Sequence, residues 1–232
     1  MLDRSKKNKP TVIVKSFTIT LFFLFSCSAI NIPSYYITPF VYAYESIIGK
    51  PDTQFSKNLI DSIPYASMKV KIGKGNSGLV ILERIDKDET SWVSADEVNF
   101  LIKNGKIIRT SGLTNNLSRY QGFTPKFSEL LKREIKLQPL EFTSYYSFSQ
   151  PDLLDLKVSI IWKYEGEREI EILGNKKKVL LVEEIVRGKK IGWKARNRYW
   201  VDPNDGFIWK STQSVSPKIP EIKYEVTKKP AI

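Results

Sequence analysis

Short segments rich in β-branched, aromatic and other apolar residues, separated by turn residues, fill the chain after Pro64. Two of them, residues 98–103 and 106–110, flank Asn104-Gly105, which is the strongest short hairpin signal. The predicted strands are 90–94, 98–103, 106–110, 142–148, 156–164, 168–173, 178–187, 192–201, 207–215 and 221–226. Turn residues such as Gly166 and Gly174-Asn175 separate the later strands. Turn signals about 8–12 residues apart, without intervening helices, favour an antiparallel meander.

One segment, residues 125–135, has helical spacing instead. Thr124 can cap it, Pro125 suits its first turn, and apolar residues recur at Phe127, Leu130, Leu131 and Ile135. The sequence therefore predicts a mainly β fold, an antiparallel meander that forms a sheet or a partly open barrel, with one short helix. We expect this β-rich domain to span residues 55–232.

The N-terminus has the layout of a secretory leader. A basic front precedes the apolar run 16–25, and Leu24-Phe25-Ser26-Cys27 resembles the lipobox of bacterial lipoproteins. Cys27 is the only cysteine in the chain, and its thiol is the nucleophile that takes the diacylglyceryl group. We expect a lipoprotein signal peptide over 1–26, lipidation of Cys27, and an acylated tether over 27–54. Several acyl chains would anchor the protein stably to a membrane.

Two other fates of the leader remain open. Cleavage after Ala43 by an ordinary signal peptidase would release a soluble periplasmic protein. An uncleaved leader would act as an anchor, although its apolar run is shorter than the roughly 20 residues that span a bilayer. Ser28 follows Cys27, so by analogy with enterobacterial sorting we expect the periplasmic face of the outer membrane.

Composition excludes whole classes of chemistry. The 232 residues include no histidine and one cysteine, so Ser-His-Asp and Cys-His catalysis and histidine-containing zinc sites are ruled out. The net charge is +12; the leader's five basic residues and one acidic residue supply +4, leaving +8 on the rest. This excess of positive charge favours an anionic partner, and nucleic acid is not expected for an exported protein.

Carboxylates are the only remaining candidates for general acids and bases. Glu183 and Glu184 are adjacent on a predicted strand, so they should point to opposite faces and cannot serve one site. The stretch Asp202-Pro203-Asn204-Asp205-Gly206 is typical of a β-turn and lacks the spacing of a calcium loop. We therefore expect no catalytic site, no metal site and no cofactor.

A basic stretch on the strand 192–201 is the main binding candidate. By the two-residue period of a strand, its residues at even positions should share one face, with Trp193 on the other. The candidate contacts for an anionic glycan are Lys194, Arg196, Arg198 and Trp200. The alternative is that these cations pair with Glu183, Glu184 and other acids of neighbouring strands.

Aromatic residues are concentrated in the second half of the chain and allow two interpretations. They could stack on sugar rings in a groove, or they could pack the core of the sheet. The residues concerned are Trp162, Trp193, Tyr199, Trp200, Phe207 and Trp209.

Several short motifs occur in a distinctive order between about residues 47 and 217. They are Ile63-Pro64-Tyr65-Ala66-Ser67, Trp92-Val93-Ser94-Ala95-Asp96, the stretch 104–113, Tyr199-Trp200-Val201-Asp202, the stretch 206–211, and Gln213. With the lipobox, this series resembles the YjbF/GfcB-type lipoproteins encoded with capsule and exopolysaccharide export machinery in Gram-negative bacteria. The resemblance implies a non-enzymatic outer-membrane lipoprotein, with a mostly antiparallel β fold, that aids polysaccharide secretion or assembly.

Other functions remain to be weighed. A lipid or lipoprotein carrier would need a curved sheet with a dry, unfilled concave face, whereas a packed core or a polar aromatic groove would favour the polysaccharide role. A carboxylate-based glycan hydrolase would need two inward carboxylates in one cleft. The expected partners are the membrane, through the lipid anchor, and acidic polysaccharide or proteins of the export machinery.

Overall fold

A computed structural model describes residues 54–132 and 138–231 of the chain. Within them, twelve strands form one sheet in the order β5-β4-β3-β2-β1-β12-β11-β10-β9-β8-β7-β6, and every paired neighbour is antiparallel. The strands are β1 (Ser67–Ile72), β2 (Gly78–Asp86), β3 (Glu89–Ser94), β4 (Asn99–Lys103), β5 (Lys106–Ser111), β6 (Asn116–Gln121), β7 (Leu140–Ser149), β8 (Leu153–Ile172), β9 (Asn175–Gly188), β10 (Trp193–Val201), β11 (Ile208–Gln213) and β12 (Ile222–Lys228). The predicted antiparallel meander is confirmed.

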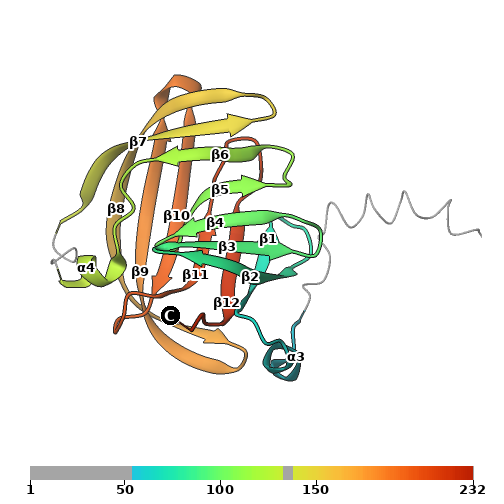
Figure 1. Ribbon diagram of the computed structural model, residues 1–232. Coiled ribbons are helices and arrows are strands. Elements are labelled where there is room, and N and C mark those ends of the chain that lie inside the picture. Colours follow the sequence, from blue (N-terminus) through green and yellow to red (C-terminus); the bar gives the residue numbers. More distant parts are fainter. Residues whose placement is uncertain (1–53, 133–137, 232) are drawn as a thin grey trace, which may run out of the picture. The chain divides into compact units, whose positions relative to one another are not determined.

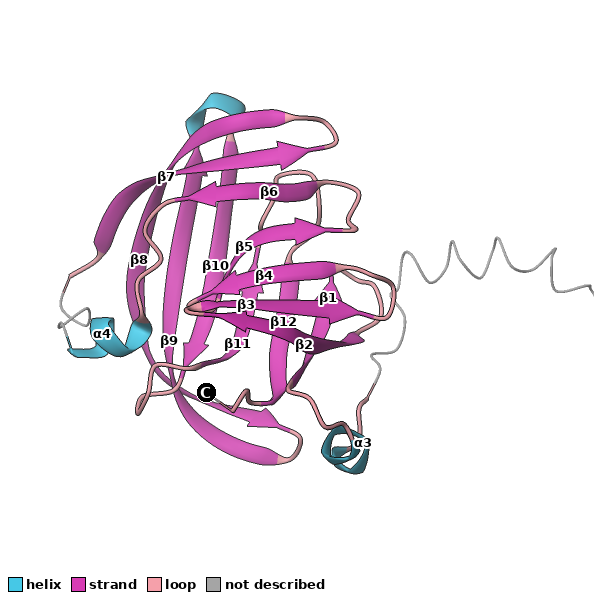
Figure 2. Cartoon of the chain, in the orientation of Figure 1, coloured by secondary structure: helices cyan, strands magenta, loops and turns pink. Residues whose placement is uncertain are grey.

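The sheet curls into a nearly closed barrel, in which β2–β6 face β8–β11 (Figures 1 and 2). The first and last strands of the described chain, β1 and β12, pair in the middle of the sheet. Its two ends, β5 and β6, follow each other in sequence. Across this seam the Leu117 N–H donates to Thr110 Oγ1 at 3.0 Å. One short loop thus brings the ends of the sheet together without a backbone ladder between β5 and β6 in the described chain.

Strand alternation fills the barrel with side chains. On β10, for example, Trp193, Asn197, Tyr199 and Val201 are buried, whereas Lys194, Arg196 and Arg198 are exposed on the other face. Aromatic rings pack the interior: Phe127, Trp162 and Tyr199 form a cluster in which the Trp162 ring centre lies 4.9 Å from that of Phe127 and 5.5 Å from that of Tyr199, and the Phe127 and Tyr199 centres are 5.7 Å apart. The barrel is therefore a packed core.

Three short helical segments accompany the strands. The helix α4 (Phe127–Lys132) lies inside the predicted segment 125–135, of which residues 133–135 fall outside the described ranges. The sequence did not predict α3 (Lys57–Ser62), which begins where Ser56 Oγ accepts from the Leu59 N–H at 3.2 Å, or the 3₁₀ turn η1 (Lys189–Ile191). A helix of six residues is too short for its periodicity to stand out.

The predicted turn at Gly166 is wrong. β8 runs through this position as one long strand, and its pairing register with β9 shifts between Tyr164 and Gly166. Glu165 is the extra residue, and Gly166 adopts a φ of 97°. The glycine therefore belongs to a β-bulge. Bulges and turns can both need a residue with positive φ, so a glycine in the sequence does not distinguish them.

The predicted signal peptide, residues 1–26, and nearly all of the predicted tether, including Cys27, lie outside the described ranges. In residues 54–132 and 138–231, no helix has the length and apolar character needed to cross a membrane.

Candidate functional site

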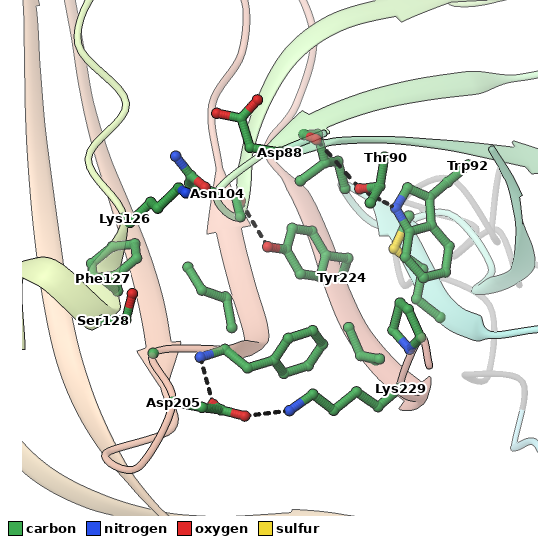
Figure 3. A pocket seen from close by; sticks show the side chains of 18 of the residues that line it. Asp88, Thr90, Trp92, Asn104, Lys126, Phe127, Ser128, Asp205, Tyr224 and Lys229 are labelled. Atoms are coloured by element: carbon green, nitrogen blue, oxygen red, sulfur yellow. Dashed lines mark hydrogen bonds and ion pairs between the residues drawn. The ribbon is translucent and has the colours of Figure 1, made fainter. Parts of the chain in front are cut away.

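A pocket of about 480 Å³ opens at one end of the barrel, where the turns after β2, β4 and β10, the start of α4 and the segment after β12 meet (Figure 3). We call it the end pocket. Its walls are mainly apolar and aromatic, and they include Met68, Trp92, Ile102, Phe127, Phe207, Ile208, Tyr224 and Val226. Pockets of this size and lining are typical of small-ligand sites.

The predicted Asn104-Gly105 hairpin forms part of the pocket wall. Both residues have positive φ, 48° and 78°, as such a tight turn requires. The Gly105 carbonyl accepts from Tyr224 Oη at 2.7 Å and from Gln213 Nε2 at 2.8 Å. A Cβ at Gly105 would lie 2.2 Å from Ile208 Cδ1. The turn is thus fixed against β11 and β12, and only glycine fits there.

Polar groups on the pocket floor are already bonded to the protein. Trp92 Nε1 donates to Thr90 Oγ1 at 2.8 Å, and Thr90 Oγ1 donates to the Ile102 carbonyl at 3.3 Å. Burial raises the pKa of Tyr224 well above its ordinary value, so its hydroxyl stays a neutral donor. The floor therefore offers mostly apolar surface to a ligand.

The rim carries charges of both signs. Asp205 pairs with Lys229 and also accepts from the Phe207 N–H at 2.9 Å. Burial opposes ionisation of Asp205, but the bonds from Lys229 and the Phe207 N–H and the charge of Lys229 together outweigh it and lower the pKa of that carboxyl. Asp88 pairs with Lys103 at 3.3 Å. Asp205 thus has a lysine partner of its own, whereas Asp88 shares Lys103 with Glu89.

Two other rim lysines are not matched in this way. Lys87 lies in the turn between β2 and β3, and Lys126 precedes α4; both are exposed and line the pocket. Neither has an acidic partner within residues 54–132 and 138–231. Three lysines and two aspartates line the pocket, so its lining carries one positive charge in excess.

The predicted basic stretch lies elsewhere, on the outer face of β10. Lys194, Arg196 and Arg198, which we call the basic face, are exposed, and Trp200 beside them is half-buried. Lys210 Nζ of β11 lies 5.6 Å from the centre of the Trp200 ring. None of the basic-face residues lines the end pocket, and Lys194 borders a separate hollow beside η1. The basic face and the end pocket are thus distinct surfaces.

Glu183 neutralises part of the basic face. Its Oε1 lies 3.4 Å from Arg196 Nε and 3.7 Å from Arg198 Nε, as the alternative interpretation expected for this residue. For Glu184 that alternative is wrong, because Glu184 points into the barrel and pairs there with Lys106. The prediction that the two glutamates occupy opposite faces is confirmed.

The aromatic residues divide between the two interpretations. Trp162, Trp193 and Tyr199 are core residues, with at most 6% of their surface exposed. Phe207 lines the end pocket, and its ring meets that of Trp209 edge-on, 4.9 Å away. The aromatic cluster at the turn after β10 is therefore partly accessible.

Sequence reasoning did not single out most of the end pocket, in particular Thr90, Lys126, Tyr224 and Lys229. The predicted meander could have indicated which turns meet, because alternate turns of a meander lie at the same end of its sheet. The turns at 87–88, 104–105 and 203–206 all reach this end. Their lysines, aspartates and aromatic residues could have been grouped on that ground.

A family model described as "Group 4 capsule polysaccharide lipoprotein gfcB, YjbF" matches residues 42–226. The chain belongs to this family. Two curated relatives from Escherichia coli strain K12 are each 22% identical: the uncharacterized lipoprotein YjbF, over 171 residues, and the uncharacterized lipoprotein GfcB, over 170. The matches cover 73% and 72% of this chain and 78% of each relative.

The fold is also that of a solved relative. The crystal structure of the hypothetical lipoprotein YmcC from Escherichia coli K12 superposes with a TM-score of 0.65 at 18% identity, covering 99% of this chain and 100% of that one. At this identity the likeness establishes the fold alone, a mainly β, twelve-stranded, nearly closed barrel.

Proposed function

We propose that the protein is a non-enzymatic accessory to capsule or exopolysaccharide secretion or assembly, held by lipid on Cys27 at the periplasmic face of the outer membrane. Membership of the capsule polysaccharide lipoprotein family carries this proposal. The lipobox and the single cysteine supply its anchor, and the basic face supplies a surface for an acidic polymer or an acidic partner protein.

A lipid carrier is less well supported. Such a protein would hold acyl chains in the interior of its sheet, but here rings such as Trp162, Tyr146 and Tyr199 fill that interior. The end pocket lies at one end of the barrel, and its rim carries both lysines and aspartates.

Hydrolysis is also poorly supported. The end pocket holds two carboxylates, Asp88 and Asp205, and each is paired with a lysine. A general acid for glycoside cleavage needs a raised pKa, whereas the pKa of Asp205 is lowered.

The proposal is tested in the native bacterium by deleting the gene and restoring it as wild type or as Cys27→Ala. We expect deletion to reduce surface polysaccharide, measured as hexuronate and hexose in cell-bound and released fractions. Wild type should restore it and Cys27→Ala should not. The purified protein should leave the size distribution of the polymer unchanged. Unaltered polysaccharide in the deletion strain, or shortening of the polymer by purified protein, would contradict the proposal.

A further inference from the structure

We infer that the end pocket is a binding site for one negatively charged sugar unit, of the hexuronate type, from a polysaccharide chain. The inference rests on the proposed function for its choice of polymer. The site itself is argued from the geometry and charge of the pocket.

The first argument is charge. Lys229 pairs with Asp205, and Asp88 shares Lys103 with Glu89. Lys87 and Lys126 then remain without an acidic partner among the described residues, on two different segments that border the same 480 Å³ pocket. A carboxylate entering the pocket would supply the missing counter-charge. Charge-assisted bonds of this kind are stronger than those between neutral groups.

The second argument is the shape and chemistry of the walls. Four aromatic residues line the pocket: Phe207 is half-buried, whereas Trp92, Phe127 and Tyr224 are each only 3% exposed and form its base. Hydrogen bonds fix Trp92 to Thr90 and Tyr224 to the Gly105 carbonyl. Figure 3 shows Tyr224 between Trp92 on one side and Phe127 on the other. The apolar C–H face of a sugar ring would pack on Phe207, and the fixed rings beneath keep the base of the pocket apolar and rigid.

The third argument is the mixture of polar groups on the rim. Asn104 donates one N–H to the Thr124 carbonyl at 2.7 Å, which orients its amide and leaves its side-chain oxygen as an acceptor. The Ser128 hydroxyl also lines the pocket and is half-buried. Asp205 retains acceptor capacity beyond its bonds to Lys229 and Phe207. A fatty acid would use the lysines and leave these acceptors unmatched, whereas sugar hydroxyls would bond to them.

The experiment uses the purified chain without its leader residues 1–26 and with Cys27 replaced by serine. Binding is measured by titration calorimetry and tryptophan fluorescence with three probes: a tetrasaccharide of glucuronic acid and glucose, the matching neutral glucose tetrasaccharide, and laurate. We expect the acidic tetrasaccharide to bind and the neutral one to bind at least about tenfold more weakly, because one charge-assisted contact is lost.

The decisive variant is Lys87→Ala with Lys126→Ala. Both side chains are exposed, so the melting temperature should stay within about a degree of wild type, while binding of the acidic tetrasaccharide should weaken at least about tenfold. The matched control is Lys157→Ala with Lys190→Ala, which removes the same charge from exposed positions outside the pocket and should bind as wild type. Lys126→Glu alone, a charge reversal at the rim, should weaken binding further than Lys126→Ala.

The outcomes separate this inference from the proposed function. If long acidic polysaccharide binds in a salt-dependent way while the tetrasaccharide does not, the pocket inference fails and the basic face remains as the contact. Tighter binding of laurate than of the acidic tetrasaccharide, lost in the double variant, would show a lipid site and overturn the inference. Equal loss of binding in the lysine control and the rim variant would show general charge attraction and would also overturn it.

Discussion

Lys106 Nζ on β5 lies 2.5 Å from Glu184 Oε1 on β9, and the two side chains are only 2% and 0% exposed. This ion pair crosses the interior of the barrel and links β5, at one end of the sheet order, to a strand eight positions away. The other carboxylate oxygen, Oε2, accepts from Asn197 Nδ2 and Tyr199 Oη, both at 2.7 Å. Both oxygens of Glu184 thus have donors, and Lys106 supplies the opposite charge in a place where an unpaired charge would be costly.

Removing one partner of this pair should strongly destabilise the fold. We expect Lys106→Met or Glu184→Gln to lower the free energy of unfolding by about 3–5 kcal/mol, because each leaves a buried group without its partner. The double variant should lose less than the sum of the single changes, since it removes both charges together. Urea unfolding of the four proteins measures this coupling. Strictly additive losses would show that the two residues do not depend on each other.

Acid should weaken the fold through the same carboxylate. Burial disfavours ionised Glu184, but the charge of Lys106 and the bonds from Lys106, Asn197 and Tyr199 outweigh it and lower the pKa of Glu184 below its ordinary value of 4.5. A carboxyl with a lowered pKa in the fold stabilises it above the unfolded pKa, and this stabilisation is lost as the pH falls towards the folded pKa. Melting temperatures should therefore drop below about pH 4.5 more steeply in wild type than in Glu184→Gln. Parallel acid profiles for the two proteins would contradict this.

The hairpin beside the end pocket should tolerate no side chain at Gly105. Its φ of 78°, and the 2.2 Å that would separate an added Cβ from Ile208 Cδ1, predict a loss of at least about 2 kcal/mol for Gly105→Ala. Gly174 is the matched control, because it has a φ of 77° and nothing within 4 Å of an added Cβ. Gly174→Ala should cost only about 1 kcal/mol, the penalty for positive φ itself. Equal losses in urea unfolding would show that contact with Ile208 is unimportant.

These residues also show which features of the fold could be predicted from the sequence and which could not. Asn104-Gly105 predicted its turn because the turn depends on local backbone conformation alone. The outward projection of Lys194, Arg196 and Arg198 followed from strand alternation, which is also local. The Lys106–Glu184 pair joins residues 78 positions apart, and nothing in the neighbourhood of Lys106 marks it as a buried lysine. The end pocket depended likewise on which turns meet in space, so only the completed sheet order brought its lysines together.

The basic face should bind acidic polymer through its excess charge. We expect Lys194→Ser, Arg196→Ser and Arg198→Ser together to weaken binding of acidic polysaccharide, with wild-type binding falling as salt rises, because screening shortens to about 8 Å at physiological ionic strength. The triple variant should also melt at a lower temperature, since Glu183 is only 7% exposed and loses both arginines.

Adding Glu183→Gln to that triple variant separates the two effects. The extra change removes the stranded charge, so the melting temperature should recover while binding stays weak. Sedimentation of the polymer with each protein measures binding, and differential scanning calorimetry measures stability. Wild-type affinity in the quadruple variant would show that the basic face serves the fold and not the polymer.

The lipid anchor can be tested against release by an ordinary signal peptidase with two substitutions. The sequence predicts that Cys27→Ala abolishes incorporation of labelled palmitate and leaves an unprocessed precursor, because only the cysteine thiol can take the diacylglyceryl group. Ala43→Glu should have no effect on processing of a lipoprotein, because its chain is cut before Cys27. The same substitution would block an ordinary signal peptidase, which needs a small residue before its cleavage site. Cell fractionation and the mass of the mature protein measure both variants. If Cys27→Ala is processed normally and Ala43→Glu is not cleaved, the lipoprotein interpretation is wrong. The mature protein would then be a soluble periplasmic protein that begins at Tyr44.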